Sequence, residues 1–331
     1  MKPKIYRYTL IPFSLIYYIF ISLRNIFYRI GIFRKYALDV KVISVGNITW
    51  GGTGKTPVVL FILETILKKR LRPAVLIRGY GNDEEDLFSR LFPGVPVWVG
   101  KDRVKNGMAA IARDSVDTLL LDDGFQYRRL KRDLDIVCID AIDCFGNGCV
   151  IPAGSMREGL SSLKRADIFL ITKVDLAKDQ KALQNLENKL RRLNPKALVV
   201  KAIHKAQHFY KLSDNEIIDL GRLKNKSVVL ISAIGNPMSF EKTALNLGLN
   251  VNRHFVFRDH HWYKKKELEN IDSYCKKNGI SMAITTEKDV VRLRGAGYVT
   301  QNANIFALAI KLNIIENEQA FYNRLFGIYN S

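Results

Sequence analysis

Residues 41–57 read KVISVGNITWGGTGKTP, and this stretch decides the fold of the 331-residue chain. A β-branched run, Val42–Val45, leads into a glycine-rich turn, and apolar residues at helical spacing follow over residues 58–67. A buried strand, a glycine-rich loop and a helix in this order predict a phosphate-binding loop. The loop departs from the general pattern G-x-x-x-x-G-K-S/T, because no glycine stands at position 49 and two stand at 51 and 52.

The residues of this loop are suited to hold a nucleotide phosphate. Glycines let successive backbone N–H groups turn inward on phosphate oxygens, and the dipole of the following helix adds attraction. Lys55 is then expected at the β- and γ-phosphates and Thr56 as a ligand of Mg²⁺. A glycine-rich turn without a ligand is the alternative, but the flanking strand and helix argue against it. The expected nucleotide contacts are Asn47, Gly51, Gly52, Thr53, Gly54, Lys55, Thr56 and Pro57.

Short β-branched runs alternate with helical patterns along the chain, which predicts an α/β protein with parallel sheets covered by helices. The strands are expected at 42–45, 74–77, 95–99, 116–121, 134–139 and 168–172, and in a second series at 227–233, 254–257 and 282–285. Helices are expected at 238–247 and 264–278. Two extended stretches, 197–203 and 305–312, are expected to pair as a connector that carries the chain out to a second domain and back.

The predicted organisation is a P-loop NTPase-like parallel-sheet domain, a second, smaller α/β domain and an N-terminal membrane-associating helix. We place the N-terminal helix in residues 1–35 and the nucleotide-binding domain in 36–203. The smaller domain with its connector strands covers 204–312, and a C-terminal helix covers 313–331.

The composition is that of an ordered globular protein with an excess of positive charge. The chain has 47% hydrophobic and 25% charged residues and a formal net charge of +20, which implies a polyanionic partner. The basic residues are dispersed and no aromatic-basic RNA-binding motif is present, so nucleic acid is not expected as a partner. The four cysteines lack C-x-x-C spacing, which indicates a reducing compartment and no zinc site.

The N-terminal run Leu10–Leu23 is apolar apart from two serines. It is shorter than the roughly 20 residues that span a bilayer as a helix. Arg24 and Arg29 interrupt the apolar pattern that continues past it, which favours a helix lying in the membrane interface over anionic headgroups. A core helix with a basic face is the alternative. A cleaved signal peptide is not expected, because no small-residue cleavage site precedes Arg24.

Two adjacent aspartates, Asp122 and Asp123, follow the hydrophobic run 116–121. The carboxyl ends of parallel strands face the nucleotide, so a Mg²⁺-facing carboxylate is expected here. We assign Asp122 to the metal together with Thr56, and Asp123 to catalysis together with Lys55. A solvated turn is the alternative.

Eight sequence islands in one order give the chain a resemblance to the tetraacyldisaccharide 4'-kinase family over nearly its whole length. The islands are VGNITWGGTGKTP at 45–57, RGYG at 78–81, Asp83-Glu84, VWVGKDR at 97–103, DDGFQ at 122–126, NG..IPAGSMRE at 147–158, DHH at 259–261 and TEKDVVRL at 286–293. The resemblance also accounts for the double-glycine loop.

The resemblance implies transfer of the ATP γ-phosphoryl group to the 4'-hydroxyl of tetraacyldisaccharide 1-phosphate, which gives the bisphosphorylated lipid A precursor lipid IVA. The implied cofactors are ATP and Mg²⁺, and the implied partners are the acylated disaccharide 1-phosphate and an anionic membrane surface. The implied location is the cytoplasmic face of a bacterial inner membrane, as a monotopic or peripheral protein. Two α/β domains with a cleft between them agree with the strand pattern.

The resemblance also assigns roles to individual residues. Asp83 becomes the partner of a DHH histidine in deprotonating the sugar hydroxyl, and we favour His261 over His260. Arg157 and Glu158 become nucleotide or phosphate contacts. The alternatives are an exposed acidic run for Asp83, a structural histidine pair and a solvated loop pair.

Other stretches leave alternatives open. The TEKD stretch at 286–289 resembles the family but would read identically as a helix N-cap. Thr172-Lys173-Val174-Asp175 imitates the base-reading motif of GTPases, and we give guanine specificity little weight. Tyr127 stands where a histidine is expected and Gly159 where a proline is usual, which predicts a looser loop. The rival functions are a soluble P-loop GTPase or ATPase switch, a metal-insertion factor, or a nucleic-acid-binding module.

Overall fold

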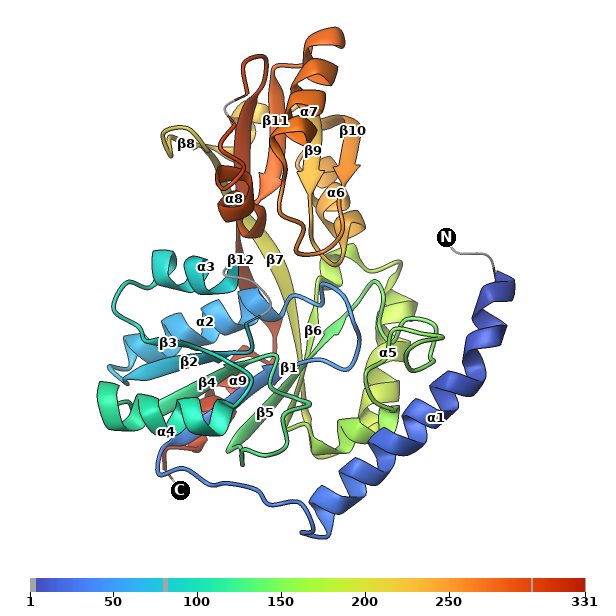
Figure 1. Ribbon diagram of the computed structural model, residues 1–331, viewed down its shortest axis with the longest axis vertical. Helices are drawn as coiled ribbons and strands as arrows, with labels where there is room; N and C mark the ends of the chain where they lie inside the picture. The colour runs from blue at the N-terminus through green and yellow to red at the C-terminus, as the bar shows by residue number, and fades with distance from the viewer. Residues whose placement is uncertain (1–3, 80–82, 299, 331) are drawn as a thin grey trace. The chain divides into compact units, whose positions relative to one another are not determined.

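The computed structural model describes residues 4–79, 83–298 and 300–330 and divides into two compact units (Figure 1). The first unit comprises residues 1–79, 94–203 and 314–331, and the second comprises 80–93 and 204–313. Strands β7 (Leu198–Lys211) and β12 (Asn304–Glu316) carry the chain from one unit to the other and back. These strands are hydrogen-bonded neighbours, which confirms the predicted pairing of the connector stretches.

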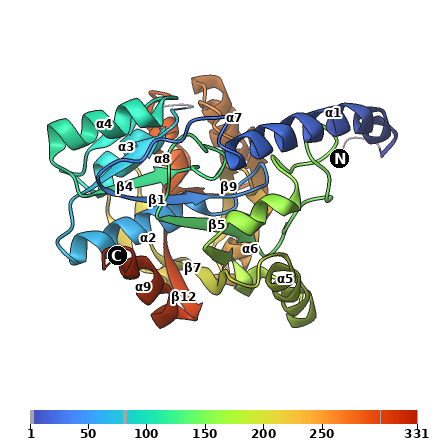
Figure 2. The ribbon, with the colours of Figure 1, turned by 90° about the horizontal axis from the view of Figure 1, so that it is seen from below.

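The first unit is a parallel sheet whose strand order is β7-β6-β5-β1-β4-β2-β3. Figure 2 shows α4 on one side of this sheet and α2 and α9 on the other. The central strands are buried along their whole length apart from Lys41 at the start of β1, as expected where helices cover both faces. The strands are β1 (Lys41–Gly46), β2 (Pro73–Ile77), β3 (Val97–Val99), β4 (Thr118–Asp122), β5 (Leu134–Asp140) and β6 (Ile168–Thr172). The helices are α2 (Lys55–Lys68), α4 (Arg103–Asp114), α5 (Gln180–Leu193) and α9 (Glu318–Gly327).

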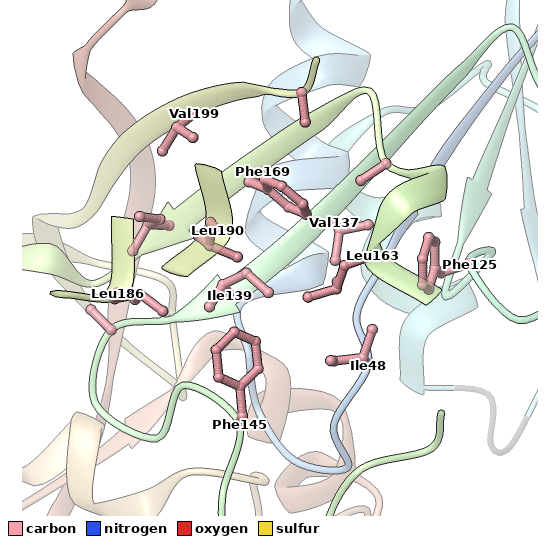
Figure 3. Close-up of a cluster of buried hydrophobic side chains, with 14 of the residues drawn as sticks. Ile48, Phe125, Val137, Ile139, Phe145, Leu163, Phe169, Leu186, Leu190 and Val199 are labelled. Carbon is pink, nitrogen blue, oxygen red and sulfur yellow. The ribbon is translucent and has the colours of Figure 1, made fainter. Parts of the chain in front are cut away.

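A cluster of buried apolar side chains supports the loops at the carboxyl ends of these strands (Figure 3). Ile48, from the phosphate loop, and Phe125, from the turn after β4, lie in one cluster with side chains of β5, β6 and α5. Gly46 is required beside them, because a Cβ at this position would lie 2.5 Å from the Cβ of Phe125. The apolar core therefore fixes where both loops leave the sheet.

The N-terminal helix α1 (Lys4–Arg29) binds the first unit through one face only. The Ser14 hydroxyl donates to the carbonyl of Val150 at 3.0 Å and accepts from the amide of Ala153 at 2.8 Å. The Tyr17 hydroxyl donates to the carbonyl of Arg157 at 2.9 Å. The apolar side chains on the rest of the helix are exposed, so the alternative of a core helix is wrong; they include Ile11, Phe13, Leu15, Ile16, Ile19, Phe20 and Leu23. The part from Thr9 to Arg29 is long and apolar enough to cross a membrane by length and composition alone.

The second unit has the strand order β10-β9-β11-β12-β7, with the short strand β8 (Ile217–Ile218) antiparallel to β7. Its other strands are β9 (Ser227–Ser232), β10 (Asn250–Val256) and β11 (Met282–Thr286). Its helices are α3 (Asp83–Leu91), α6 (Pro237–Asn246), α7 (Lys265–Lys277) and α8 (Glu287–Arg294). Helix α3, although it is far away in sequence, packs against α8. The predicted α/β class with a P-loop NTPase-like parallel sheet is confirmed.

Candidate active site

The phosphate loop is closed by its own side chains between β1 and α2. The Asn47 Nδ2 donates a hydrogen bond to Thr53 Oγ1 at 2.8 Å, which joins the two ends of the turn. Gly51 and Gly54 have φ angles of 118° and 81°, a region that glycine enters without steric cost. Residues 55–57 then form the first turn of α2. The loop therefore leads into a helix N-terminus, where an anion is favoured.

The two aspartates after β4 differ in their surroundings. Asp122 is buried at the end of β4, and the register between β1 and β4 pairs it with Val45, directly before the phosphate loop. The Asp123 carboxylate lies 2.6 and 2.8 Å from Arg157 Nη1 and 3.5 Å from Lys55 Nζ. Although burial raises the pKa of Asp123, the charges of Lys55 and Arg157 hold it well below its usual range. Asp123 is therefore an ionised bridge between the loop lysine and Arg157.

In the second unit, three of the sequence islands meet at α3 and α8. Lys288 Nζ lies 3.4 Å from Glu84 Oε1 and 3.4 Å from His260 Nε2. Asp83 begins α3, one residue before Glu84, and its side chain lies outside the described part of the chain. His261 Nε2 instead lies 2.8 Å from Glu267 Oε2, close to the start of α7.

The His261 ring is also stacked on Phe257, with centroids 5.1 Å apart and an angle of 11° between the planes. Thr286 caps α8 by accepting a hydrogen bond from the amide of Asp289, so the N-cap interpretation of the TEKD stretch is confirmed.

The comparison with known families decides the identity. Residues 6–329 match the family model described as tetraacyldisaccharide-1-P 4'-kinase. The chain belongs to this family. Two curated tetraacyldisaccharide 4'-kinases illustrate the similarity. The one from Halothermothrix orenii is 33% identical over 94% of this chain and 90% of the relative, and the one from Syntrophus aciditrophicus is 36% identical over 85% and 83%.

A solved structure is similar in fold as well. It is the "apo" form of LpxK from Aquifex aeolicus in complex with ATP, with a TM-score of 0.73, 28% sequence identity, and coverage of 98% of this chain and 99% of that one. The expected activity class is thus confirmed. The tetraacyldisaccharide 4'-kinase family phosphorylates a lipid A precursor, and this chain is a kinase of that family.

Within this kinase fold, sequence reasoning missed a buried ion pair, Lys173 with Asp140, that supports the phosphate loop; we call this pair the strut. Lys173 Nζ lies 2.6 Å from Asp140 Oδ2 and donates a hydrogen bond to the carbonyl of Gly52 at 2.7 Å. The Thr172 hydroxyl donates to the carbonyl of Thr53 at 2.9 Å. The Thr-Lys pair, seen in the sequence as an imitation of a base-reading motif, therefore braces the loop. The sequence did hold a signal for this pair, namely its position at the ends of two strands. Asp140 and Thr172 are register partners at the ends of the adjacent parallel strands β5 and β6.

Arg103 is a second residue of the site that sequence reasoning missed. It is buried, and its guanidinium donates to the carbonyls of Asp122 and Asp123 at 2.8 and 2.9 Å. Arg103 is the last residue of the sequence island VWVGKDR at 97–103, and its place in this island was the signal that could have identified it. Tyr127, which stands where the family is expected to have histidine, lies below the Arg103 guanidinium at 5.5 Å and donates to Asp102.

The carboxylate of Glu158 anchors α1. It is fully buried and lies 3.0 Å from Arg24 Nη2 and 2.9 Å from Arg165 Nη2. Its expected contact with a nucleotide stays a prediction, while its observed contacts support a role in holding the helix. The expectation of a looser loop at Gly159 stays a prediction; a Cβ at this position would lie 2.5 Å from a ring carbon of Tyr18 on α1.

The residues predicted to hold Mg²⁺ fit that ion by their chemistry. A carboxylate and a hydroxyl, from Asp122 and Thr56, are hard oxygen donors of the kind that Mg²⁺ prefers. Over the residues that the structure describes, no group of three or more His, Cys, Asp or Glu side chains forms a metal site. A metal ion here would accordingly need phosphate oxygens and water to complete its shell, which is typical of Mg²⁺ bound together with a nucleotide.

Proposed function

We propose that this kinase transfers the γ-phosphoryl group of ATP to the 4'-hydroxyl of tetraacyldisaccharide 1-phosphate at the cytoplasmic face of a bacterial inner membrane. The observation that carries the proposal is the constellation around the phosphate loop, where Lys55 and Arg157 converge on Asp123. The ATP complex of LpxK from Aquifex aeolicus, which shares the fold over nearly the whole chain, supports ATP as the phosphoryl donor.

Phosphoryl transfer depends mainly on positioning and on neutralising charge that moves to the leaving oxygen. Lys55 lies at the first turn of α2, so it reaches the phosphates of a nucleotide seated on the loop. Asp123, whose carboxylate lies 3.5 Å from Lys55 Nζ, pairs with this lysine until phosphate oxygens compete for it. Arg157 adds a second cation at the same carboxylate. Thr56 and Asp122 would hold Mg²⁺, which neutralises phosphate charge when it is bound.

The group that accepts the proton from the sugar hydroxyl is proposed to be Asp83, assisted by a histidine of the DHH stretch. The contacts within the second unit favour His260 for this part over His261, which sequence reasoning preferred. His260 lies beside Lys288, which reaches Glu84 next to Asp83. His261 is held by Glu267 and by ring stacking, contacts that suit a structural role.

The α1 helix is proposed to lie in the membrane interface. A single helix that spans a bilayer is surrounded by lipid, whereas α1 is hydrogen-bonded to the rest of the first unit at Ser14, Tyr17 and Arg24. The opposite side exposes large apolar groups, with Ile16 at 65% and Ile19 at 50%. A helix with one bonded and one exposed apolar face suits a monotopic position, where its apolar face enters the lipid. This position would bring the enzyme to a substrate that sits in the membrane.

One experiment tests the proposed reaction directly. The protein is incubated with labelled ATP, Mg²⁺, detergent and tetraacyldisaccharide 1-phosphate, and the lipid products are separated. A labelled bisphosphorylated lipid is expected, and Lys55→Met provides the control for a contaminating kinase. Hydrolysis of ATP without labelled lipid would instead support the rival, a soluble nucleotide-driven switch.

A further inference from the structure

A fully buried ion pair on α8 lies behind the DHH stretch of the second unit. The side chains of Asp289 and Arg292 are both 0% exposed, and Arg292 Nη2 lies 2.7 Å from Asp289 Oδ1. Taking two charges out of water is costly, and apolar side chains of similar volume often give a fold that is at least as stable. Stability alone therefore does not account for this pair, and the groups that it binds indicate another role.

The Asp289–Arg292 pair holds the main chain at Ala233, directly after β9. The amide of Ala233 donates to Asp289 Oδ1 at 3.1 Å, and its carbonyl accepts a hydrogen bond from Arg292 Nη2 at 3.2 Å. The same carbonyl also accepts from the amide of His260, again at 3.2 Å. The guanidinium of Arg292 and the backbone of His260 are therefore joined through one carbonyl oxygen.

The pair also holds the other end of residues 259–263, which we call the DHH turn. The Tyr263 hydroxyl donates to Asp289 Oδ1 at 3.1 Å. Between these two anchors His260 has a φ angle of 60°, in the left-handed region that residues other than glycine enter at a cost in free energy. Such a conformation persists where the surrounding contacts fix it. The hydrogen bonds at His260 and Tyr263 supply contacts of this kind.

Helix α8 presents a cation to the same turn. Lys288, the residue before Asp289, places its Nζ 3.4 Å from His260 Nε2 and 3.4 Å from Glu84 Oε1. The Thr286 hydroxyl donates to Asp289 Oδ2 at 2.6 Å, which ties the buried pair to the first turn of α8. The element that anchors the DHH turn therefore also sets the distance between the imidazole and Lys288.

We propose that Asp289 and Arg292 are positioning residues for the kinase reaction, because they fix the DHH turn against α8 and so hold the His260 imidazole beside Lys288. The inference rests on the proposed part of a DHH histidine in accepting the proton, and it names the residues that orient this histidine. Neither residue of the pair needs to contact the substrate, since both act through the main chain at Ala233 and through Tyr263.

The test loosens the turn while the buried carboxylate keeps a cation. Tyr263→Phe removes the hydrogen bond at one anchor and leaves the ion pair intact. Arg292→Lys keeps the charge opposite Asp289 but replaces the branched guanidinium with a single amine. The control is Asp272→Asn, which changes a buried carboxylate of the same unit that accepts hydrogen bonds from the amides of residues 301–303. If Arg292→Lys does not fold, Tyr263→Phe carries the test.

The first measurement is steady-state kinetics with ATP and tetraacyldisaccharide 1-phosphate. Because small displacements of a catalytic group reduce the rate steeply, Tyr263→Phe and Arg292→Lys should each lower kcat about fivefold or more. Their KM for ATP should stay at the wild-type value, since the phosphate loop belongs to the first unit. The control Asp272→Asn should keep the wild-type kcat even where its melting temperature falls as far as that of the other two variants.

The second measurement is the NMR signal of the His260 imidazole in the protein without substrate, assigned with His260→Gln. This signal should shift in Tyr263→Phe and Arg292→Lys and stay unchanged in Asp272→Asn. An unchanged His260 signal in both variants, or a kcat equal to that of the wild type, would overturn the proposal. Because the NMR measurement needs no turnover, a shifted signal would still support the pair's role if the wild type made no bisphosphorylated lipid, a result that would refute the proposed function instead.

Discussion

The strut beneath the phosphate loop allows stability and function to be separated by two substitutions. The side chains of Lys173 and Asp140 are 5% and 4% exposed, so Lys173→Met leaves a buried carboxylate without its counter-ion. Breaking a buried pair in this way costs about 3–5 kcal/mol. That is a large part of the roughly 5–15 kcal/mol by which a typical domain is stable. We expect the free energy of unfolding to fall by this amount in denaturant titrations.

The double variant Lys173→Met/Asp140→Asn removes the uncompensated charge. The amide oxygen of Asn at 140 can still accept from the amide of Ile142, as Asp140 does at 2.8 Å. Most of the lost stability should therefore return. The hydrogen bond to the carbonyl of Gly52 does not return, however, because methionine has no donor.

The KM for ATP then reports on the strut alone. A hydrogen bond from a charged donor contributes about 1.5–3 kcal/mol. If most of this bond is used to hold the loop in its binding shape, the double variant should have an ATP KM raised by at least about tenfold. An ATP KM of the wild-type value in the double variant, with stability restored, would show that Lys173 acts on folding only and would refute the strut.

Three further outcomes are expected. Lys55→Ala should lower kcat by about a hundredfold or more while ATP still binds, because the lysine acts where charge shifts during transfer; turnover close to the wild type would contradict this role. Ile16→Ser/Phe20→Ser should move the protein from the membrane fraction to the soluble fraction with nucleotide binding intact, and unchanged fractionation would reject the interfacial helix. His260→Ala should lower kcat with little loss of stability, whereas His261→Ala should mainly lower the melting temperature; the reverse pattern would restore His261 as the working histidine.

Much of the phosphate loop was predictable because its signal is local. Backbone N–H groups, two glycine conformations and the start of a helix all lie within residues 46–57, so spacing along the chain describes the geometry. The predicted strands were found for a similar reason, since buried parallel strands show as continuous apolar runs. The strand β10 began earlier than predicted, at Asn250, because its polar residues hide it from a search for apolar runs.

The contacts that sequence reasoning missed are made between segments far apart in the chain. Arg103 reaches the carbonyls of Asp122 and Asp123, and main-chain carbonyls leave no mark in a sequence. The family resemblance of the stretch NG..IPAGSMRE assigned Glu158 to the nucleotide, whereas the structure shows its carboxylate bound by Arg24 on α1. The two adjacent side chains bind different partners: Arg157 binds Asp123 beside the phosphate loop, while Glu158 binds Arg24 of α1.

Arg157 also connects the phosphate loop to α1. Arg157 binds Asp123 at the phosphate loop through its side chain, and its carbonyl accepts the hydrogen bond from Tyr17 of α1. A displacement of α1 would act on the same residue whose guanidinium orients Asp123 and, through it, Lys55. α1 is therefore connected through Arg157 to the carboxylate of Asp123, which lies 3.5 Å from Lys55 Nζ, and a lipid surface that steadied α1 would also steady this carboxylate.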